Sequence, residues 1–529
     1  MAKNQMQSMM QGAFVLTAAS FAAKLLSAVY RVPFQNLVGD EGFYVYQQIY
    51  PIYGLAMTLA LSGLPQFISK YVAEQVTPKD QQTAIRKLYP IVLGAGVLLF
   101  LLTFLGAEPL AYLMGDRQLS PLIRVVSFTF LFVPILSFYR GSFQGNLLMV
   151  PTAVSQVAEQ LVRVAVILGG AVAFRQLGLT IYQAGTIAMF GALCGGAVAI
   201  MILLYYQNKI HGRRLDLQRT RLFQKWDKPL IRRFLLEGGL ISIYSGFLIL
   251  FQLVDSFLVA NALQDGGVLP QAARVTKGVY DRGQPLVQLG LVVAGALSST
   301  FLPALTRYLL GKDRSRFLST TRIYLRLTAS ISLAAAVGLA LLMPFINFAL
   351  FKDANGNLPL VIFVFAVFLM GMIQAYQSVA QSQNHFRIPL KAAAWGLLAK
   401  VVATWPFTRF LGTAGASWST LLGLSCTLWY LIRREDAAIN AFWREGRFFR
   451  KLLRSIGAMI LLILLYYLVL VIILDPRTHR LSTLLMAVGG VAVGLTGFIR
   501  SAIRNRLFTV REWLLLPFGK KILTFKLRK

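Results

Sequence analysis

The sequence predicts an all-α polytopic membrane protein with fourteen transmembrane helices. Apolar runs of about 20 residues, each long enough to cross a hydrocarbon core of about 30 Å, recur along nearly the whole chain. Hydrophobic residues make up 57% of the 529 positions and charged residues only 14%, a balance that is typical of membrane proteins and rare in soluble domains. Basic residues gather in the connections between these runs, which indicates one fixed orientation in the membrane.

The fourteen spans are joined by connections that are mostly short. They are expected near residues 11–37, 42–74, 89–108, 121–143, 150–174, 180–206, 234–261, 278–310, 323–350, 358–384, 389–411, 413–432, 453–474 and 480–500. With the amino terminus inside, most Lys and Arg residues of the connections fall on the cytoplasmic side. We therefore expect a multi-pass protein of the bacterial cytoplasmic membrane with both termini in the cytoplasm.

The chain also contains an internal repeat. Pro65 and Pro303 are 303 − 65 = 238 residues apart, and Asn146 and Asn384 have the same separation, 384 − 146 = 238. Six spans per repeat is an even number, so both halves enter the membrane from the same side and form a parallel repeat. Transporters built in this way bind their substrate between the two halves, whereas a duplication without a transport role is the alternative.

These features predict two six-helix lobes in a parallel pseudo-repeat, followed by two additional helices. In chain order, the expected parts are an N-lobe (1–206), a basic cytoplasmic linker (207–233), a C-lobe (234–432), a basic cytoplasmic loop (433–452), the two additional helices (453–500) and a basic cytoplasmic tail (501–529). The tail mixes basic and apolar residues, so it is expected either to lie on anionic membrane lipids or to be solvated.

The placement of charge, cysteine and histidine argues against several functions. The net charge of +33 suggests nucleic acid at first sight, but the basic clusters lie between hydrophobic spans, so no nucleic-acid partner is expected. Cys194 and Cys426 lie in apolar runs, which argues against a disulfide framework, and the three histidines are far apart, which argues against a metal site. We expect no cofactor, and no connection is long enough to form a separate enzyme domain.

Ionisable residues inside the predicted spans are the strongest functional signal. Such a residue costs about 2.5–3.5 kcal/mol at the centre of a membrane helix, so it normally faces protein or a water-filled cavity. Lys24 and Arg31 are seven residues apart, on nearly the same helix face, and neither has a carboxylate three or four residues away. Asp281 and Arg282 begin the eighth span beside Pro285, which predicts an irregular helix. A cationic chamber between the lobes is expected, and its arginines suit phosphate.

Other ionisable residues have competing explanations. Glu159 and Arg163 have the spacing of a helical ion pair, so they are expected to neutralise each other, with a cavity-lining role for Arg163 as the alternative. Asp255 and Lys400 lie well inside spans and are candidates for cavity or coupling residues, with a structural role equally open. Arg140 lies near a cytoplasmic span end, where its side chain can reach the membrane surface.

Three phrases of the sequence resemble a known family. They are "KLLSAVYRVPFQNLVGDEGFYVYQQIYPIY" (24–53), "SGLPQFISKYVAE" (62–74) and "GVYDRGQPLVQLG" (278–290). In these phrases, and in its fourteen-span layout, the chain resembles the MurJ-type lipid II flippases of the MOP superfamily. It is most similar to the YtgP/SpoVB-like branch of polysaccharide-biosynthesis membrane proteins.

The resemblance implies two lobes around a central cavity and a lipid-tail groove formed by the last two helices. It implies a transporter and not an enzyme, which moves an undecaprenyl-diphosphate-linked sugar, lipid II, from the cytoplasmic to the outer leaflet. The expected partners are this lipid substrate, anionic membrane lipids and cell-wall synthesis proteins, and the expected state is a monomer. The membrane potential is one source of energy, worth about 2.3 kcal/mol per charge per 100 mV.

The resemblance also implies roles for single residues. Lys24 and Arg31 lie where the family has cations in its first span, and Glu41 lies at the acidic position that follows this span. Asp281 and Arg282 match an Asp-Arg pair at the start of the eighth span. These five residues are the expected substrate-binding residues.

The sequence departs from the family pattern in two places. The stretch 51–59 lacks the arginine that gram-negative members have after the proline of the second span. Some members bind sodium through carboxylates on spans 7 and 11, and Asp255 suits the first of these positions. Span 11 offers Lys391 and Lys400 but no acid, so sodium coupling is not expected.

Three alternative functions differ in what they require. An exporter of another undecaprenyl-linked glycan shares the fold and the cationic chamber, so the sequence separates it poorly from a lipid II flippase. A MATE-like drug or cation antiporter requires twelve spans and buried carboxylates as the main charge of the cavity. A membrane-embedded glycosyltransferase requires catalytic acids or a sizeable outer loop, which the short outer connections do not provide.

Overall fold

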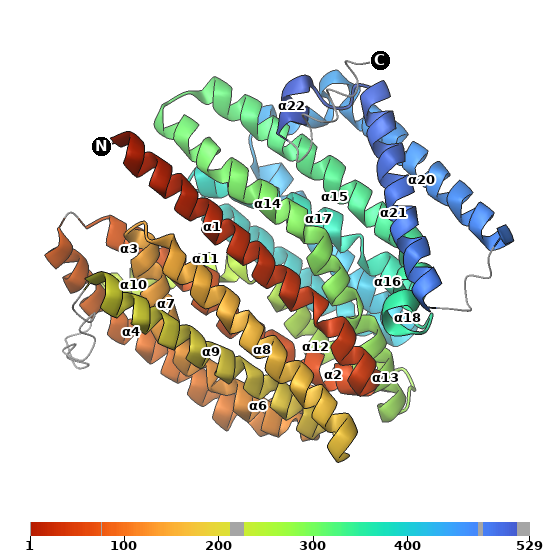
Figure 1. Cartoon of the computed structure of the whole chain (residues 1–529), viewed down its shortest axis with the longest axis horizontal. Helices are drawn as coiled ribbons and strands as arrows, with labels where there is room; N and C mark the ends of the chain where they lie inside the picture. Colours follow the sequence, from red (N-terminus) through yellow and green to blue (C-terminus); the bar gives the residue numbers. More distant parts are fainter. Residues whose placement is uncertain (1, 76, 212–226, 474–479, 516–529) are drawn as a thin grey trace. The chain divides into compact units, whose positions relative to one another are not determined.

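The computed structural model describes residues 2–75, 77–211, 227–473 and 480–515, and within these ranges the chain is helical without a strand (Figure 1). Eleven of the described helical segments are long and apolar enough to cross a membrane. The predicted all-α polytopic fold is therefore confirmed, while the count of fourteen spans stays a prediction.

The chain forms two compact units. The first consists of Met1–Pro285 and Pro389–Ser419, and the second of Leu286–Ile388 and Thr420–Lys529. The units divide the chain differently from the predicted lobes, because part of the predicted C-lobe belongs to the first unit. The lobe boundaries stay a prediction.

The helices that lie entirely within the first unit hold every candidate site residue except Arg282 and Lys400. They are α1 (Ala2–Val29), α2 (Arg31–Thr58), η1 (Leu59–Gly63), α3 (Leu64–Ala73), α4 (Pro78–Leu105), α5 (Ala107–Leu113), η2 (Arg117–Leu119), α6 (Ser120–Ser127), α7 (Thr129–Gly145), α8 (Met149–Leu177), α9 (Ile181–His211), α10 (Lys228–Arg233), η4 (Phe234–Gly238), α11 (Gly239–Ser245), α12 (Phe247–Asp265) and α13 (Pro270–Asp281).

Two helices contribute to both units, and the remaining helices belong to the second. The shared helices are α14 (Gly283–Leu310) and α18 (Arg387–Arg434). Those of the second unit are α15 (Arg314–Phe351), α16 (Asn357–Phe363), α17 (Ala366–Ser382), α19 (Ala437–Asn440), η5 (Ala441–Trp443), η6 (Glu445–Arg447), α20 (Phe448–Ile473), α21 (Arg480–Arg504) and α22 (Val510–Leu514).

The chain reverses direction at Gly39, inside the stretch assigned to α2. The hydroxyl groups of Tyr30 and Tyr46 are 2.6 Å apart, whereas 16 residues of straight helix would separate them by about 24 Å. Gly39 has φ 74° and ψ −178°, a conformation that a residue with a Cβ atom adopts only with strain. This turn lies between the first two predicted spans, and it brings the end of α1 against the middle of α2.

A second close approach brings α13 against α2. A Cβ atom at Gly278 would lie 2.1 Å from the carbonyl oxygen of Asp40, so only glycine permits this contact. The crossing places the residues that follow Gly278 beside the turn at Gly39.

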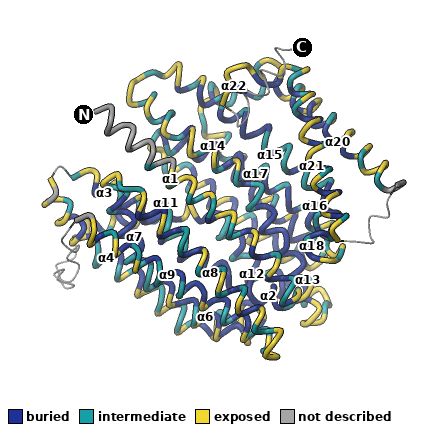
Figure 2. Tube along the Cα trace, viewed as in Figure 1, coloured by how far each residue is buried: buried dark blue, intermediate teal, exposed yellow. Residues whose placement is uncertain are grey.

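Apolar side chains remain exposed on the outer helices, as membrane exposure requires. On α4, Leu98, Leu102 and Leu105 are 57%, 60% and 74% exposed. Figure 2 shows exposed and buried positions alternating along most of the helices. In water such leucines would oppose folding, but they are compatible with a lipid environment.

Candidate anion-binding site

Arg31 is a fully buried cation at the start of α2. Its side chain is 0% exposed, and its nitrogens Nε, Nη1 and Nη2 have no hydrogen-bond partner in the described part of the chain. Its guanidinium carbon lies 4.2 Å from the centre of the Tyr50 ring. The ring stabilises the cation by about 0.5–2 kcal/mol, which is far less than a buried charge loses on leaving water.

Arg163 on α8 is a second buried cation, held by tyrosines. Its Nη1 donates a hydrogen bond to the hydroxyl of Tyr53 at 2.6 Å, and its Nη2 donates to the hydroxyl of Tyr30 at 3.0 Å. Its guanidinium carbon is also 4.5 Å from the centre of the Tyr53 ring. Because tyrosine hydroxyls are neutral, these contacts orient the guanidinium without cancelling its charge.

The tyrosines around these arginines form one group, which we call the tyrosine cluster: Tyr30, Tyr46, Tyr50 and Tyr53. Neighbouring rings lie 5.9–6.3 Å apart, Tyr30 against Tyr46, Tyr46 against Tyr50, and Tyr50 against Tyr53. The hydroxyls of Tyr30 and Tyr46 interact electrostatically with both Arg31 and Arg163. Among the described residues no carboxylate forms an ion pair with either arginine. Asp281 is near enough to Arg31 to interact with it electrostatically, but Asp281 is itself paired with Lys277.

The tyrosine cluster was not predicted from the sequence, although all four tyrosines lie within residues 24–53. Tyr46, Tyr50 and Tyr53 follow one another at intervals of four and three residues, the spacing that puts side chains on one helix face. This pattern was a usable signal, but ordinary core packing produces it as well.

Glu159 pairs with Arg140 instead of Arg163. Its Oε2 accepts a hydrogen bond from Nη2 of Arg140 at 2.7 Å, and both side chains are at most 5% exposed. Arg140 also donates to the hydroxyl of Ser155 at 3.3 Å. The expected Glu159–Arg163 pair is thus replaced by a contact between α7 and α8, and Arg140 does not reach the surface.

Arg282 and Asp281 both have charged partners in this structure. Nη2 of Arg282 is 2.7 Å from each carboxylate oxygen of Asp40, and Nε is 3.0 Å from Oδ1. Asp281 accepts from Nζ of Lys277 at 2.6 and 2.7 Å. The close crossing of α13 and α2 makes the first pair, so in this conformation Arg282 is neutralised by a residue next to the turn.

Lys24 and Glu41 lie in different surroundings from Arg31. Lys24 is exposed on α1, whereas Arg31 is buried at the start of α2. The backbone of Tyr30, which joins the two helices, is itself helical, with φ −60° and ψ −23°. Glu41 is partly buried and pairs with Arg274 on α13 at 3.4 Å. Among the five expected substrate-binding residues, Asp281 is close enough to Arg31 for an electrostatic interaction.

Asp255 and Lys400 form a buried ion pair between α12 and α18. Nζ of Lys400 is 2.5 Å from Oδ1 of Asp255, and the hydroxyl of Tyr280 donates to Oδ2 at 3.1 Å. The exposed fractions of Asp255 and Lys400 are 1% and 0%. This pair is self-neutralising, unlike the charges in the tyrosine cluster. In the described parts of the chain no three His, Cys, Asp or Glu side chains gather in an arrangement that could hold a metal ion.

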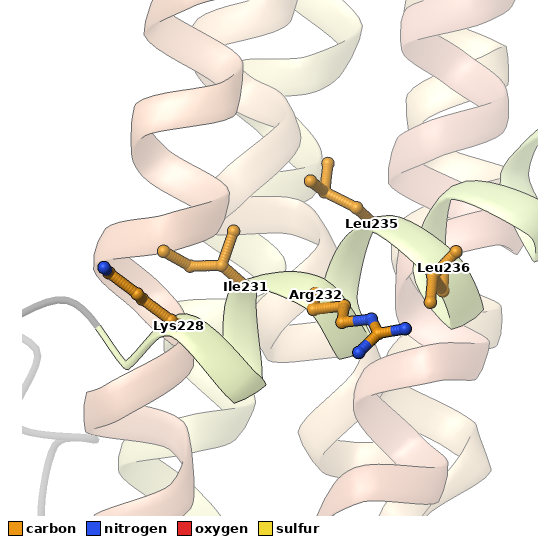
Figure 3. A pocket seen from close by; sticks show the side chains of 5 residues that line it. All are labelled: Lys228, Ile231, Arg232, Leu235 and Leu236. Atoms are coloured by element: carbon orange, nitrogen blue, oxygen red, sulfur yellow. The ribbon is translucent and has the colours of Figure 1, made fainter.

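The pockets of the first unit include a small cavity and a surface pocket. A small cavity of about 20 Å³ lies beside Tyr53 and Glu159, which is room for one water molecule and not for a sugar. A shallow surface pocket of about 390 Å³ lies on α10 and η4, lined by Lys228, Ile231, Arg232, Leu235 and Leu236 (Figure 3). Tyr53 of the tyrosine cluster borders the small cavity, and Arg31 lines neither of these two pockets.

Comparison with known proteins identifies relatives over the whole chain. Residues 9–309 match the polysaccharide biosynthesis protein family. The chain is 34% identical to the uncharacterized membrane protein YabM of Bacillus subtilis (strain 168), across 98% of this chain and 97% of that protein. It is 26% identical to the lipid II flippase MurJ of the same organism, across 80% of this chain and 81% of that protein.

Solved structures show the same fold at low sequence identity. A structure of the lipid II flippase MurJ in an inward closed conformation matches with a TM-score of 0.67 and 14% identity, across 93% of this chain and 99% of that one. An inward-facing multidrug resistance MATE transporter of the MOP superfamily matches with a TM-score of 0.62 and 14% identity, across 82% of this chain and 99% of that one. The chain therefore belongs to the polysaccharide biosynthesis protein family and has the fold of the MOP superfamily.

Proposed function

We propose that this protein is a flippase that moves lipid II, with its undecaprenyl-diphosphate-linked headgroup, from the cytoplasmic to the outer leaflet. The family assignment and the relatedness to a lipid II flippase support a transporter for a glycan on a lipid carrier. In the proposed setting, the protein is a monomer of the bacterial cytoplasmic membrane with both termini in the cytoplasm.

The observation that carries the proposal is the buried guanidinium of Arg31 without a hydrogen-bond partner in the described residues. A charge in this position destabilises the protein unless something neutralises it, so its presence has to serve a purpose other than stability. An anionic ligand provides the missing counter-charge. A guanidinium binds two phosphate oxygens at once, which makes a diphosphate a well-matched ligand.

The ion pair between Arg282 and Asp40 provides a second phosphate contact at a later step. The pair joins the end of α13 to the turn at Gly39, so these segments must separate before Arg282 can bind another anion. A diphosphate that enters this region competes with Asp40 for the guanidinium. In the proposed cycle Arg31, Arg282 and Lys24 bind the diphosphate, the prenyl tail lies along 453–500, and no covalent bond is broken.

The buried charge also argues against a drug or cation antiporter. Such an antiporter is expected to have buried carboxylates as the main charge of its cavity. Here Glu159 and Asp255 are both paired with basic residues. The two arginines beside the tyrosine cluster have no ion pair among the described residues.

Reconstitution with fluorescent lipid II tests the proposal. The protein in liposomes should move the lipid across the bilayer, and Arg31→Gln should lower the rate by at least about tenfold, as expected when a charge-assisted contact is lost. Arg124→Gln serves as the control, because Arg124 is an exposed residue that pairs with Glu108. Unchanged transport by folded Arg31→Gln protein would contradict the proposed phosphate contact.

A flippase for another undecaprenyl-linked glycan is the second candidate, and the family match favours it as much as lipid II. The matched family covers polysaccharide biosynthesis in general, and the chain is 30% identical to stage V sporulation protein B of Bacillus subtilis across 57% of this chain and 58% of that protein. The same liposomes loaded with a second undecaprenyl-diphosphate glycan separate the two candidates by their relative rates.

A further inference from the structure

We propose that Arg163 and the tyrosine cluster form a second phosphate subsite beside Arg31, which makes the protein select diphosphate carriers over monophosphate carriers. This inference rests on the proposed function and specifies which lipid carriers the protein accepts. Arg163 lies on α8, whereas the other expected phosphate contacts come from α1, α2 and the turn after α13.

The charge of the tyrosine cluster matches a ligand with two anionic groups. Arg31 and Arg163 are 0% and 2% exposed, and both act on the hydroxyls of Tyr30 and Tyr46. Two like charges that share one buried cluster repel each other, and the repulsion is strong where water is excluded. A monophosphate has one phosphoryl group to share between the two guanidinium groups, whereas a diphosphate offers one phosphoryl group to each.

The partners of Arg163 can be replaced by phosphate oxygens. Its Nη1 and Nη2 bond to the neutral hydroxyls of Tyr53 and Tyr30, and its Nε has no partner in the described part of the chain. A phosphate adds the attraction of an opposite charge and can accept two parallel hydrogen bonds from one guanidinium, which a neutral hydroxyl cannot do. The displaced tyrosine hydroxyls can then turn and donate to the same phosphate.

The cavity beside the tyrosine cluster is too small for a phosphate, so the surrounding helices have to move when the ligand binds. It is about 20 Å³ in volume and borders Tyr53, so a phosphate enters only when α2 and α8 move apart. Residues of α2 that follow Gly39 form most of the tyrosine cluster, so a movement of α2 about this turn opens the cluster and exposes both arginines.

Arg140 provides an internal comparison for Arg163. It is equally buried and lies on the adjacent helix α7, but its charge is cancelled by Glu159 at 2.7 Å. A buried arginine with its own carboxylate has no need of an anionic ligand. Selectivity for a diphosphate is therefore expected to depend on Arg163 and not on Arg140.

The test compares the binding of undecaprenyl diphosphate and undecaprenyl monophosphate to the full-length protein in nanodiscs, measured by native mass spectrometry. The wild type should bind the diphosphate more tightly, and Arg163→Gln should lower this preference by about tenfold or more while monophosphate affinity changes little. The double variant Arg140→Gln with Glu159→Gln is the matched control, because it removes a neutral pair, and it should keep the preference.

Gln160→Glu keeps the test decisive if Arg163→Gln fails to fold. Gln160 is 1% exposed on α8, and its Oε1 has no partner in the described residues. A carboxylate there lies three residues before Arg163 and gives it an internal counter-charge, so the preference for the diphosphate should fall although the arginine remains.

Three results would overturn the inference. Folded Arg163→Gln or Gln160→Glu protein that keeps the wild-type preference contradicts it, and so does wild-type protein that binds both carriers equally. In each of these cases carrier binding itself, and the proposed function with it, survives. Wild-type protein that binds neither carrier contradicts the proposed function and this inference together.

Discussion

Arg140 and Arg163 are both buried in the same unit, but one is neutralised and the other is not. Arg140 is held by a carboxylate, a hydroxyl and a backbone carbonyl, so all of its charge has a local counterpart. Arg163 is held by two tyrosine hydroxyls and aromatic faces, and Arg31 lies against the Tyr50 ring and interacts electrostatically with the hydroxyls of the same tyrosines. The first arrangement neutralises the charge in a contact between two helices, whereas the second leaves its guanidinium groups without an ion pair among the described residues.

The largest expected effect comes from breaking the neutralised pair. Glu159→Gln leaves Arg140 buried without its carboxylate, which should destabilise the protein by about 3–5 kcal/mol. The loss should appear as a large fall in the thermal unfolding temperature of detergent-solubilised protein. The double variant with Arg140→Gln should recover most of it, and a single variant as stable as the wild type would show that the pair is not structural.

Replacing Arg31 beside the tyrosine cluster should raise stability, whereas Glu159→Gln should lower it. Arg31→Met removes a buried charge that has no partner and should raise stability by about 1–3 kcal/mol in the absence of ligand, while transport is lost. Thermal unfolding and lipid II transport are measured on the same preparation. A loss of stability together with transport would mean that Arg31 is structural, like Arg140.

A smaller effect is expected from the ring that supports Arg31. Tyr50→Leu keeps an apolar side chain but removes the cation–π contact, which should cost about 0.5–2 kcal/mol. Tyr50→Phe keeps the aromatic face and is the matched control. If both variants are equally destabilised in thermal unfolding, the hydroxyl and not the ring face is what Tyr50 contributes.

The smallest effect is expected at the surface. Arg124 and Glu108 form a 2.7 Å ion pair whose side chains are 49% and 74% exposed. Solvent and salt screen such a pair, so Arg124→Gln should change stability by less than about 1 kcal/mol, and the change should shrink further at high salt. A change as large as that of Glu159→Gln would mean that burial does not explain the contrast between the buried arginines.

The fold class was predictable because hydropathy and the placement of charge are local properties of the sequence. Apolar runs must be helical in a membrane, since lipid offers no partner for backbone polar groups, and the all-α polytopic architecture follows. The turn at Gly39 separates two spans that the sequence analysis divided at nearly the same place. The number of spans and the lobe boundaries depend on contacts between distant segments, which local patterns do not determine.

The candidate site was predictable only in part. Arg31 was singled out because no neighbour on its own helix can neutralise it, and it is indeed buried without a carboxylate among the described residues. Arg163 was assigned the wrong partner, since spacing along one helix favoured Glu159, whereas packing of α7 on α8 gives Glu159 to Arg140. Asp40 was overlooked because its importance arises from a crossing with α13, which is distant in sequence.

The most direct test of the account is whether a diphosphate carrier stabilises the protein through Arg31. A ligand that binds only the folded state stabilises it by an amount that grows with the logarithm of the ligand concentration divided by Kd. Undecaprenyl diphosphate should therefore raise the thermal unfolding temperature of the wild type and not that of Arg31→Gln. An equal rise in the two proteins would contradict the claim that this buried guanidinium binds the diphosphate.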